Sequence, residues 1–359
     1  MNDKTSKVKA FLKKKDIEIS VKRYGIDALG AMAQGLFCSL LIGTIINTAG
    51  TQLGIEFLTT PLATIGGTDY TLGGLATAMS GPAMATAIGY ALNCPPLVLF
   101  SLITVGFASN ALGGAGGPLA VLFIAIIASE AGKAISKETR VDILVTPLVT
   151  IGVGVALSYW WAPAIGAAAM KVGSLIMWAT NLQPFLMGII VSVLVGIALT
   201  LPISSAAICA ALGLTGLAGG AALAGCCAQM VGFAVMSFRE NRWGGLISQG
   251  IGTSMLQVPN IVKKPIIWLP VILSSAILGP VGTLALHMTN NATGSGMGTA
   301  GLVGQIMTWQ TMIQTEAAAV VLGKILLIQV ILPAVVTLVI SEFMRKKGWI
   351  KFGDMKLEF

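Results

Sequence analysis

The stretch "ALGAMAQGLFCSLLIGTIIN", residues 28–47, contains no charged side chain. An α-helix rises about 1.5 Å per residue, so about 20 apolar residues cross the ~30 Å hydrocarbon core of a bilayer. The stretch therefore predicts a transmembrane helix over about 26–48. Similar stretches recur to about residue 340, and the whole chain is 55% hydrophobic and 10% charged. This composition predicts an all-α polytopic membrane protein.

We expect about ten transmembrane helices with re-entrant hairpin segments between some of them. The expected spans are 26–48, 72–93, 97–112, 118–135, 142–161, 184–200, 203–221, 223–238, 266–286 and 318–341. Glycine and proline predict helix breaks at 80–82, 93–96 and 110–118. We expect residues 49–70 to form an outer loop or a short hairpin. We expect residues 162–183 to form an outer interfacial segment, and residues 244–264 to form a re-entrant or interfacial segment.

The net charge of +8 comes mostly from basic residues outside the apolar segments. The clusters occupy residues 1–24, 133–140, 239–242, 263–264 and 342–359. If they share one side, the positive-inside rule makes that side cytoplasmic, with anionic lipid rather than nucleic acid as the expected partner. We therefore expect a cytoplasmic basic amphipathic segment over 1–24, a transmembrane domain over 25–343 and a cytoplasmic tail over 344–359.

A polar segment, "HMTNNATGSGMGTAGLVGQ" at residues 287–305, interrupts the apolar pattern. Lipid cannot satisfy its amides and exposed backbone, and each unpaired group costs on the order of several kcal/mol. The segment is therefore either an exposed outer loop or a re-entrant segment lined by protein. Residues 301–316, "GLVGQIMTWQTMIQTE", are too polar for a lipid-facing span and too apolar for a free loop, which favours the re-entrant arrangement.

Ionisable and amide side chains in apolar surroundings are the candidates for a binding site. Glu316, at the mouth of the last span, is either a functional acid or the partner of Lys324, although eight residues along one helix would keep them from being direct neighbours. His287 is either a ligand or proton carrier, or a cap at a helix end. The amides that either bind hydroxyl-rich ligands or join helices are Asn93, Asn110, Gln257 and Asn260.

The sequence lacks the motifs of several enzyme classes. It has no G-x-x-x-x-G-K-[ST], which excludes a P-loop ATP motor within this chain. Its single histidine cannot be assigned to a Ser-His-Asp triad, and its cysteines have no metal-ligand spacing. No catalytic residue, metal or cofactor is therefore expected.

Four blocks of the sequence carry a resemblance to a known family. The blocks are "RYGIDALGAMAQGLFCSLLIGTI" (23–45), "AMSGPAMATAIGYALNCPPLVLFS" (78–101), "FRENRWGGLISQGIGTSMLQVPNI" (238–261) and "NNATGSGMGTAGLVGQ" (290–305). In this order they resemble the EIIC-like membrane proteins of the phosphotransferase system (PTS), over nearly the whole chain. Within that family the chain looks most similar to the branch often labelled as the perfringolysin regulator protein.

The resemblance implies a sugar-transporting subunit, a homodimer, in a bacterial-type cell membrane with both termini cytoplasmic. It also implies that the phosphocarrier proteins IIA and IIB are separate chains. In such proteins a polar hairpin with a carboxylate and nearby His or Asn binds sugar hydroxyls, which the resemblance carries over to His287, Asn290, Asn291 and Glu316. The full set of candidate substrate-binding residues is His287, Asn290, Asn291, Thr293, Gln305, Glu316, Asn93, Asn110, Gln257 and Asn260.

The expected function is therefore a permease that moves a small polar solute, a sugar in the first instance, by alternating access. With no catalytic residue of its own, the chain would be at most the permease component of a sugar phosphotransferase. One alternative is an ion- or proton-coupled secondary transporter of a non-sugar solute. Another is a membrane sensor or regulator without transport.

Overall fold

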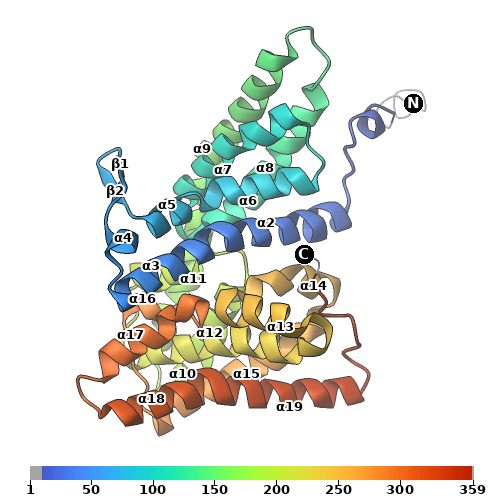
Figure 1. Ribbon diagram of the computed structural model, residues 1–359. Coiled ribbons are helices and arrows are strands. Elements are labelled where there is room, and N and C mark those ends of the chain that lie inside the picture. Colours follow the sequence, from blue (N-terminus) through green and yellow to red (C-terminus); the bar gives the residue numbers. More distant parts are fainter. Residues whose placement is uncertain (1–9, 358–359) are drawn as a thin grey trace. The chain divides into compact units, whose positions relative to one another are not determined.

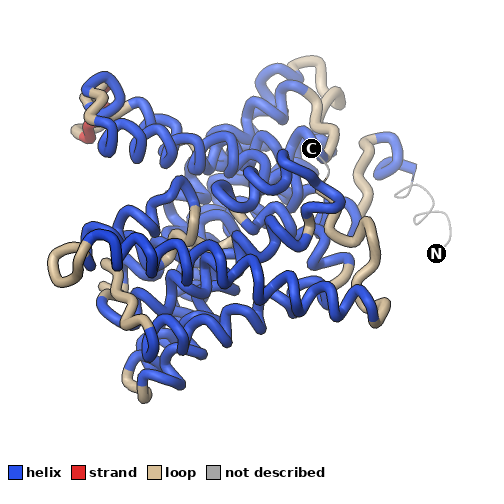
Figure 2. Tube along the Cα trace, turned by 60° about the horizontal axis from the view of Figure 1, so that its bottom comes forward, coloured by secondary structure: helices blue, strands red, loops and turns tan. Residues whose placement is uncertain are grey.

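The computed structural model describes residues 10–357, which form two compact units. Unit 1 combines the residues up to Leu40 with Ala78–Ala167, and unit 2 combines Leu41–Thr77 with the residues from Ala168 onward. Helices dominate both units, and the strands among the described residues form one short hairpin (Figure 2). The all-α fold class is therefore confirmed.

Unit 1 consists of helices whose interruptions lie close to glycine and proline residues. Its elements (η marks a 3₁₀ or π turn) are η1 (Arg23–Asp27), α2 (Ala28–Leu36), α6 (Ser80–Ala91), α7 (Pro96–Gly113), η3 (Gly114–Gly116), α8 (Gly117–Ile135) and the first part of α9 (Asp142–Thr180). Proline suits the first position of α7 because that position needs no N–H donor. Gly114, with φ of 50°, ends the same helix. The helix breaks expected at 93–96 and 110–118 are confirmed, whereas residues 80–82 start α6 and the break near them lies at Met79.

Of the basic segment expected at the N-terminus, residues 1–9 lie outside the described residues. Residues 10–14 are helical, and the chain then reaches η1 through an extended stretch. The domain boundaries expected at residues 24 and 343 stay predictions, since the packing divides the chain elsewhere.

Unit 2 holds the remaining helices. Its elements are α3 (Ile42–Leu53), α4 (Glu56–Thr59), β1 (Ala63–Ile65), β2 (Thr68–Tyr70), α5 (Leu72–Ala78, to Thr77), the end of α9, α10 (Pro184–Thr200), α11 (Ser205–Ala211), α12 (Gly216–Met236), α13 (Phe238–Ile247), η4 (Ser248–Gly252), η5 (Ser254–Gln257), α14 (Val258–Lys263), η6 (Pro265–Trp268), α15 (Leu269–Pro280), η7 (Val281–Ala285), α16 (Ala292–Ser295), η8 (Ala300–Leu302), α17 (Val303–Met312), α18 (Ala318–Leu326), η9 (Leu327–Ile331) and α19 (Leu332–Lys346). The turn η2 (Phe37–Leu41) joins α2 to α3 across the unit boundary. The strands β1 and β2 confirm the short hairpin expected within residues 49–70.

The core of unit 2 forms around α12, which packs against α10, α15 and α19 (Figure 1). Nearly every residue of α12 from Gly219 to Met236 is buried. Small residues permit this close approach: a Cβ at Gly225 would overlap the backbone carbonyl of Ser192 on α10. The glycine- and alanine-rich sequence of α12 is therefore a packing requirement.

Six helical segments among the described residues are long and apolar enough to cross a membrane. They are Arg23–Leu53, Pro96–Ile135, Asp142–Thr180, Gly216–Met236, Pro265–Ala285 and Ala318–Lys346, and Pro184–Thr200 is a shorter apolar helix. Because η3 divides Pro96–Ile135 into α7 and α8, that segment supplies two of the expected spans. The protein is thus a polytopic integral membrane protein.

Two expected boundaries are wrong. The spans at 203–221 and 223–238 are not separate, because Gly213 and Gly216, with φ of 61° and 64°, end the short α11 and start one long α12. The interfacial segment at 162–183 is also not distinct, since α9 continues to Thr180 through an alanine-rich sequence that favours helix despite Pro163.

Candidate functional site

The polar segment at 287–305 is folded into unit 2 against α12. Asn290 forms an antiparallel bridge with Gly216, with N···O distances of 2.9 and 3.2 Å. A Cβ at Gly220 would overlap the backbone carbonyl of Met288, so the segment touches α12 directly. Most residues from Met288 to Gly304 are buried or half-buried. The structure therefore agrees with a re-entrant arrangement and not with an exposed loop.

Side chains of this segment form hydrogen bonds with backbone groups of the segment itself and with the backbone carbonyl of Leu214. Asn290 is fully buried; its Oδ1 accepts the Asn291 N–H at 2.8 Å, and its Nδ2 donates to Gly304 O at 3.4 Å, which ties the two arms of the segment together. Asn291 Oδ1 caps α16 by accepting the Gly294 N–H at 2.9 Å. Ser295 Oγ donates to Leu214 O at 2.8 Å. Two predicted site residues, Asn290 and Asn291, thus shape the segment itself.

Polar side chains of α17, of α18 and η9, and of the connection between them form three separate contacts. Gln305 and Thr308 are three residues apart on α17, so they share one face. Gln305 Nε2 donates to Cys227 Sγ on α12 at 3.6 Å. Thr308 Oγ1 donates to Gly304 O at 2.8 Å and accepts from Gln329 Nε2 at 3.0 Å. We call Gln305, Thr308, Glu316, Lys324 and Gln329 the polar seam.

Glu316 pairs with Lys324 at 2.7 Å between Oε1 and Nζ. The expectation that these two residues are not direct neighbours is wrong, because Glu316 precedes α18 and its side chain lies along the first turns of that helix. Both side chains are largely buried, with 27% and 19% of their surface exposed. An acid and a base are thus held together at one end of the seam.

Three acceptor oxygens of the seam are buried and have no hydrogen-bond donor among residues 10–357: Gln305 Oε1, Glu316 Oε2 and Gln329 Oε1. Thr308 donates its hydroxyl proton to Gly304 O, and in its contact with Gln329 the NH₂ group of Gln329 is the donor. A buried unpaired acceptor costs about 1–3 kcal/mol, and proteins keep few of them. The seam can therefore accept hydrogen bonds from a hydroxyl-rich ligand.

Other predicted residues of the hairpin lie outside the seam. His287, with φ of 47°, has an exposed side chain after η7, and Thr293 is exposed on α16. Gln329, which the sequence reasoning missed, is 1% exposed. Its signal in the sequence is a single amide within the apolar run "ILLIQVIL", residues 325–332.

Gln257 and Asn260 belong to a second cluster, which holds the C-terminal tail. Gln257 Nε2 donates to Met355 O at 3.0 Å, and Asn260 Nδ2 donates to Lys356 O at 2.9 Å. Asn241 on α13 also binds the C-terminal tail: its Nδ2 donates to Met355 O and its Oδ1 accepts the Leu357 N–H, each at 2.8 Å. Met355 is fully buried. Their observed contacts are those of a clamp on the tail.

Asn93 and Asn110 have their partners within unit 1. Asn110 Nδ2 donates to Ser80 Oγ at 3.3 Å, between α7 and α6. Asn93, with φ of 56°, follows α6 and donates to Asp16 Oδ2 at 3.3 Å. The Arg23 guanidinium also binds Asp16, and these contacts lower the pKa of that carboxyl from 3.8 to about 2. Both amides thus join elements of unit 1.

A metal site requires several ligating side chains close together. Within residues 10–357, the structure brings together no group of three or more His, Cys, Asp or Glu side chains that could hold a metal ion. The seam offers one carboxylate and two amide oxygens, all of which can accept hydrogen bonds from hydroxyl groups.

The chain is thus an integral membrane protein with a polar segment folded against its helices, and the comparison with known families assigns its class. The family model described as "Phosphotransferase system, EIIC" matches residues 26–357. The chain therefore belongs to the phosphotransferase-system EIIC family and is a membrane permease component. No curated protein and no solved structure gives a significant match to the chain.

Proposed function

We propose that this EIIC protein binds a small, hydroxyl-rich solute, a sugar or sugar derivative, in the polar seam beside the hairpin. The observation that carries the proposal is a set of three buried acceptors that find no donor in the described part of the chain, Gln305 Oε1, Glu316 Oε2 and Gln329 Oε1. Sugar hydroxyls are donors of the kind that such buried oxygens lack. Hydrogen bonds to Cys227 and Thr308 hold the side chains of Gln305 and Gln329 in place, respectively.

Membership of the family supports group translocation as the mode of transport. In this mode the solute hydroxyl attacks the phosphorus carried by a separate IIB chain, the bond to the carrier side chain breaks, and the hydroxyl proton passes to a base. The unpaired Oε2 of Glu316 is the candidate base. IIA and IIB as separate chains, a homodimer, cytoplasmic termini, contact with anionic lipid and the perfringolysin-regulator branch all remain parts of the proposal.

A second mode is supported by the pair of Glu316 and Lys324. An acid and a base in contact inside a transporter can exchange a proton as the solute binds and leaves. In that case the solute would move unmodified and its uptake would follow the proton gradient. The candidate residues are the same, so the two modes are separated by the product and by the energy source.

The test begins with a thermal-shift screen of the purified full-length chain against sugars, sugar phosphates, carboxylates, nucleosides and ions. A ligand at ~100 times its dissociation constant adds about 2.7 kcal/mol to the stability of the folded state. The Gln305→Leu variant, expected to bind about tenfold more weakly, should keep only about 1.4 kcal/mol of this stabilisation at the same ligand concentration. Gln310→Leu is the matched control, because Gln310 is exposed on the same helix.

Proteoliposomes loaded with the solute identified in this way then separate the modes. Group translocation predicts a phosphorylated solute that forms only when IIA, IIB and a phosphoryl donor are present. Proton coupling predicts unmodified solute and uptake that stops when the proton gradient is collapsed. Stabilisation that is equal in Gln305→Leu and the wild-type protein would contradict the placement of the site.

A further inference from the structure

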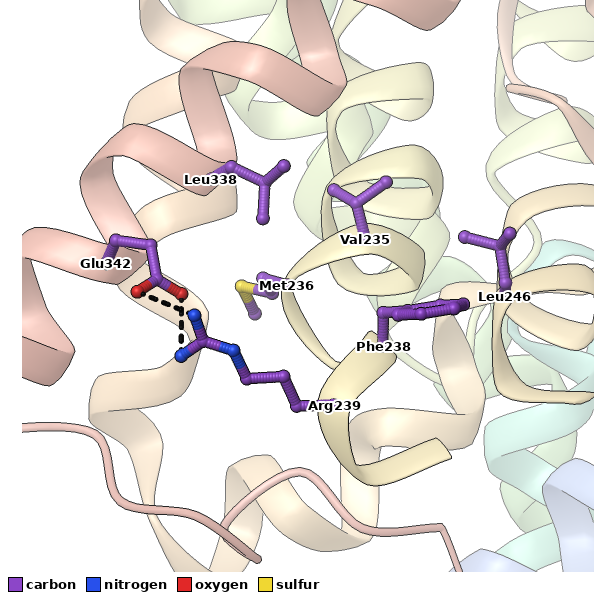
Figure 3. A pocket seen from close by; sticks show the side chains of 7 residues that line it. All are labelled: Val235, Met236, Phe238, Arg239, Leu246, Leu338 and Glu342. Atoms are coloured by element: carbon purple, nitrogen blue, oxygen red, sulfur yellow. Dashed lines mark hydrogen bonds and ion pairs between the residues drawn. The ribbon is translucent and has the colours of Figure 1, made fainter. Parts of the chain in front are cut away.

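A cavity of about 500 Å³ lies in unit 2 where α12 ends, beside α13 and α19 (Figure 3). Its volume is in the range of small-molecule sites, roughly 300–1,000 Å³. The residues that line it are Val235, Met236, Phe238, Arg239, Leu246, Leu338 and Glu342. Five of these are apolar and two carry opposite charges, and we call the cavity the apolar groove.

The two charged residues face each other across the groove. Arg239 on α13 and Glu342 on α19 form two contacts, at 3.1 and 3.2 Å, which Figure 3 shows as dashed lines. Their side chains remain 60% and 37% exposed, so both charges also reach the surroundings. A guanidinium has five N–H donors and a carboxylate about four acceptor positions, so each can bind a further group while the pair persists.

Aromatic and basic residues surround this end of the helices. Trp243 and Phe343 have 68% and 56% of their surface exposed, and the Trp243 ring packs edge-on against Phe238 in the groove wall at 5.4 Å. Lys346 and Lys347 follow on α19 and are exposed. Exposed aromatic rings beside basic residues are typical of the lipid headgroup level. The residues around the groove are thus of the kinds expected at the headgroup level.

We propose that the apolar groove binds one phospholipid with a zwitterionic, amine-bearing headgroup such as phosphatidylethanolamine. The acyl chain would lie against Val235, Leu246 and Leu338. The lipid phosphate would accept hydrogen bonds from Arg239, and the lipid ammonium would donate to Glu342. A purely anionic headgroup matches the site less well, because Glu342 repels it and Arg239 is the one cation among the described residues that line the groove.

The inference does not depend on the proposed transport function. It is tested on the full-length chain in detergent by native mass spectrometry with phosphatidylethanolamine and phosphatidylglycerol of the same acyl composition in competition. The wild-type protein should retain phosphatidylethanolamine roughly 2- to 5-fold more than phosphatidylglycerol, the range for ion pairs that remain partly exposed to water. A bulky residue in the wall, Leu246→Trp, should reduce retention of both lipids.

The charge variants give the decisive result. Glu342→Gln removes the ammonium partner and leaves Arg239 unpaired, so the preference should change to phosphatidylglycerol. Arg239→Gln should weaken both lipids, since both lose the phosphate partner. Arg140→Gln and Glu56→Gln remove exposed charges elsewhere and should leave the preference unchanged.

Two outcomes would overturn the proposal. One is equal retention of the two lipids by the wild-type protein. The other is a preference for phosphatidylethanolamine that persists in Glu342→Gln, because the carboxylate would then not bind the headgroup amine.

Discussion

Replacement of Gln329 by methionine is expected to stabilise the protein while it weakens solute binding. Gln329 is 1% exposed and lies between α17 and η9, with its Nε2 on Thr308 and its Oε1 unpaired among residues 10–357. Methionine has nearly the same length and shape but no acceptor that requires a partner. The variant therefore removes a group that we assign to the ligand and not to the fold.

The magnitude follows from the two polar atoms of the amide. Loss of the hydrogen bond to Thr308 costs about 0.5–1.5 kcal/mol, and removal of the buried unpaired Oε1 recovers about 1–3 kcal/mol. Thr308 still donates to Gly304 O at 2.8 Å, so no new unpaired donor is created. The net expectation is a gain of about 1 kcal/mol in the free energy of unfolding without ligand.

Gln229 on α12 provides the matched control, because it is equally buried but fully paired. Its Oε1 accepts from Trp268 Nε1 at 2.8 Å and from Thr200 Oγ1 at 3.1 Å, and its Nε2 donates to Ser275 Oγ at 3.4 Å. The same change, Gln229→Met, leaves the Trp268 N–H without an acceptor and should destabilise the protein by on the order of 2–4 kcal/mol.

The assay is unfolding of both variants in one detergent, followed by intrinsic fluorescence, with and without the solute found by thermal shift. Opposite signs for Gln329→Met and Gln229→Met, together with loss of the solute effect in Gln329→Met, are the expected results. If Gln329→Met destabilises the protein as much as Gln229→Met, then Gln329 is a structural amide and the reasoning about the seam is refuted.

Three further predictions concern the parts that surround the site. Met355→Ala should lower the free energy of unfolding, measured by chemical denaturation, by about 2–5 kcal/mol because Met355 is fully buried. An effect below ~1 kcal/mol would show that the C-terminal tail is not part of the core. Gly220→Val should destabilise the protein by about 1–3 kcal/mol and weaken solute binding, because the valine side chain would displace Met288 at the start of the hairpin. Unchanged affinity for the solute would show that the hairpin does not shape the binding site. The Arg23 guanidinium lowers the pKa of Asp16 to about 2, so the contribution of this carboxylate to stability is present above pH ~4 and is lost as the pH falls through ~2. Asp16→Asn should therefore reduce the melting temperature at pH 7 and have no effect on it at the acid end. A difference in melting temperature that does not change with pH would contradict the ion pair.

The membrane class could be predicted from the sequence, because long apolar segments are stable in lipid. For residues 287–305 the sequence excluded contact with lipid, since unpaired polar backbone is unstable there, and left an exposed loop and a re-entrant segment as alternatives. The helix breaks at 93–96 and 110–118 could also be predicted, since proline and glycine disturb the helix locally. These are properties of short segments, and short segments can be judged without knowing what packs against them.

The partners of the individual polar residues could not be predicted. The pairing of Glu316 with Lys324 depends on where α18 begins, and the pairing of Gln329 with Thr308 depends on how two helices align. Gln257 and Asn260 bind the C-terminal tail, which is far away in the sequence. The extent of α12 depended on positive φ angles at Gly213 and Gly216, which glycine permits but does not require.

The most direct test of the central claim is the dissociation constant of the solute, measured by isothermal titration calorimetry for four proteins. These are the wild-type chain, Gln305→Leu, Glu316→Gln and the exposed control Gln310→Leu. If the polar seam binds the solute, the first two variants should bind about tenfold more weakly, the equivalent of one hydrogen bond of ~1.4 kcal/mol, and the control should equal the wild type. Equal dissociation constants for all four proteins would show that the solute binds elsewhere.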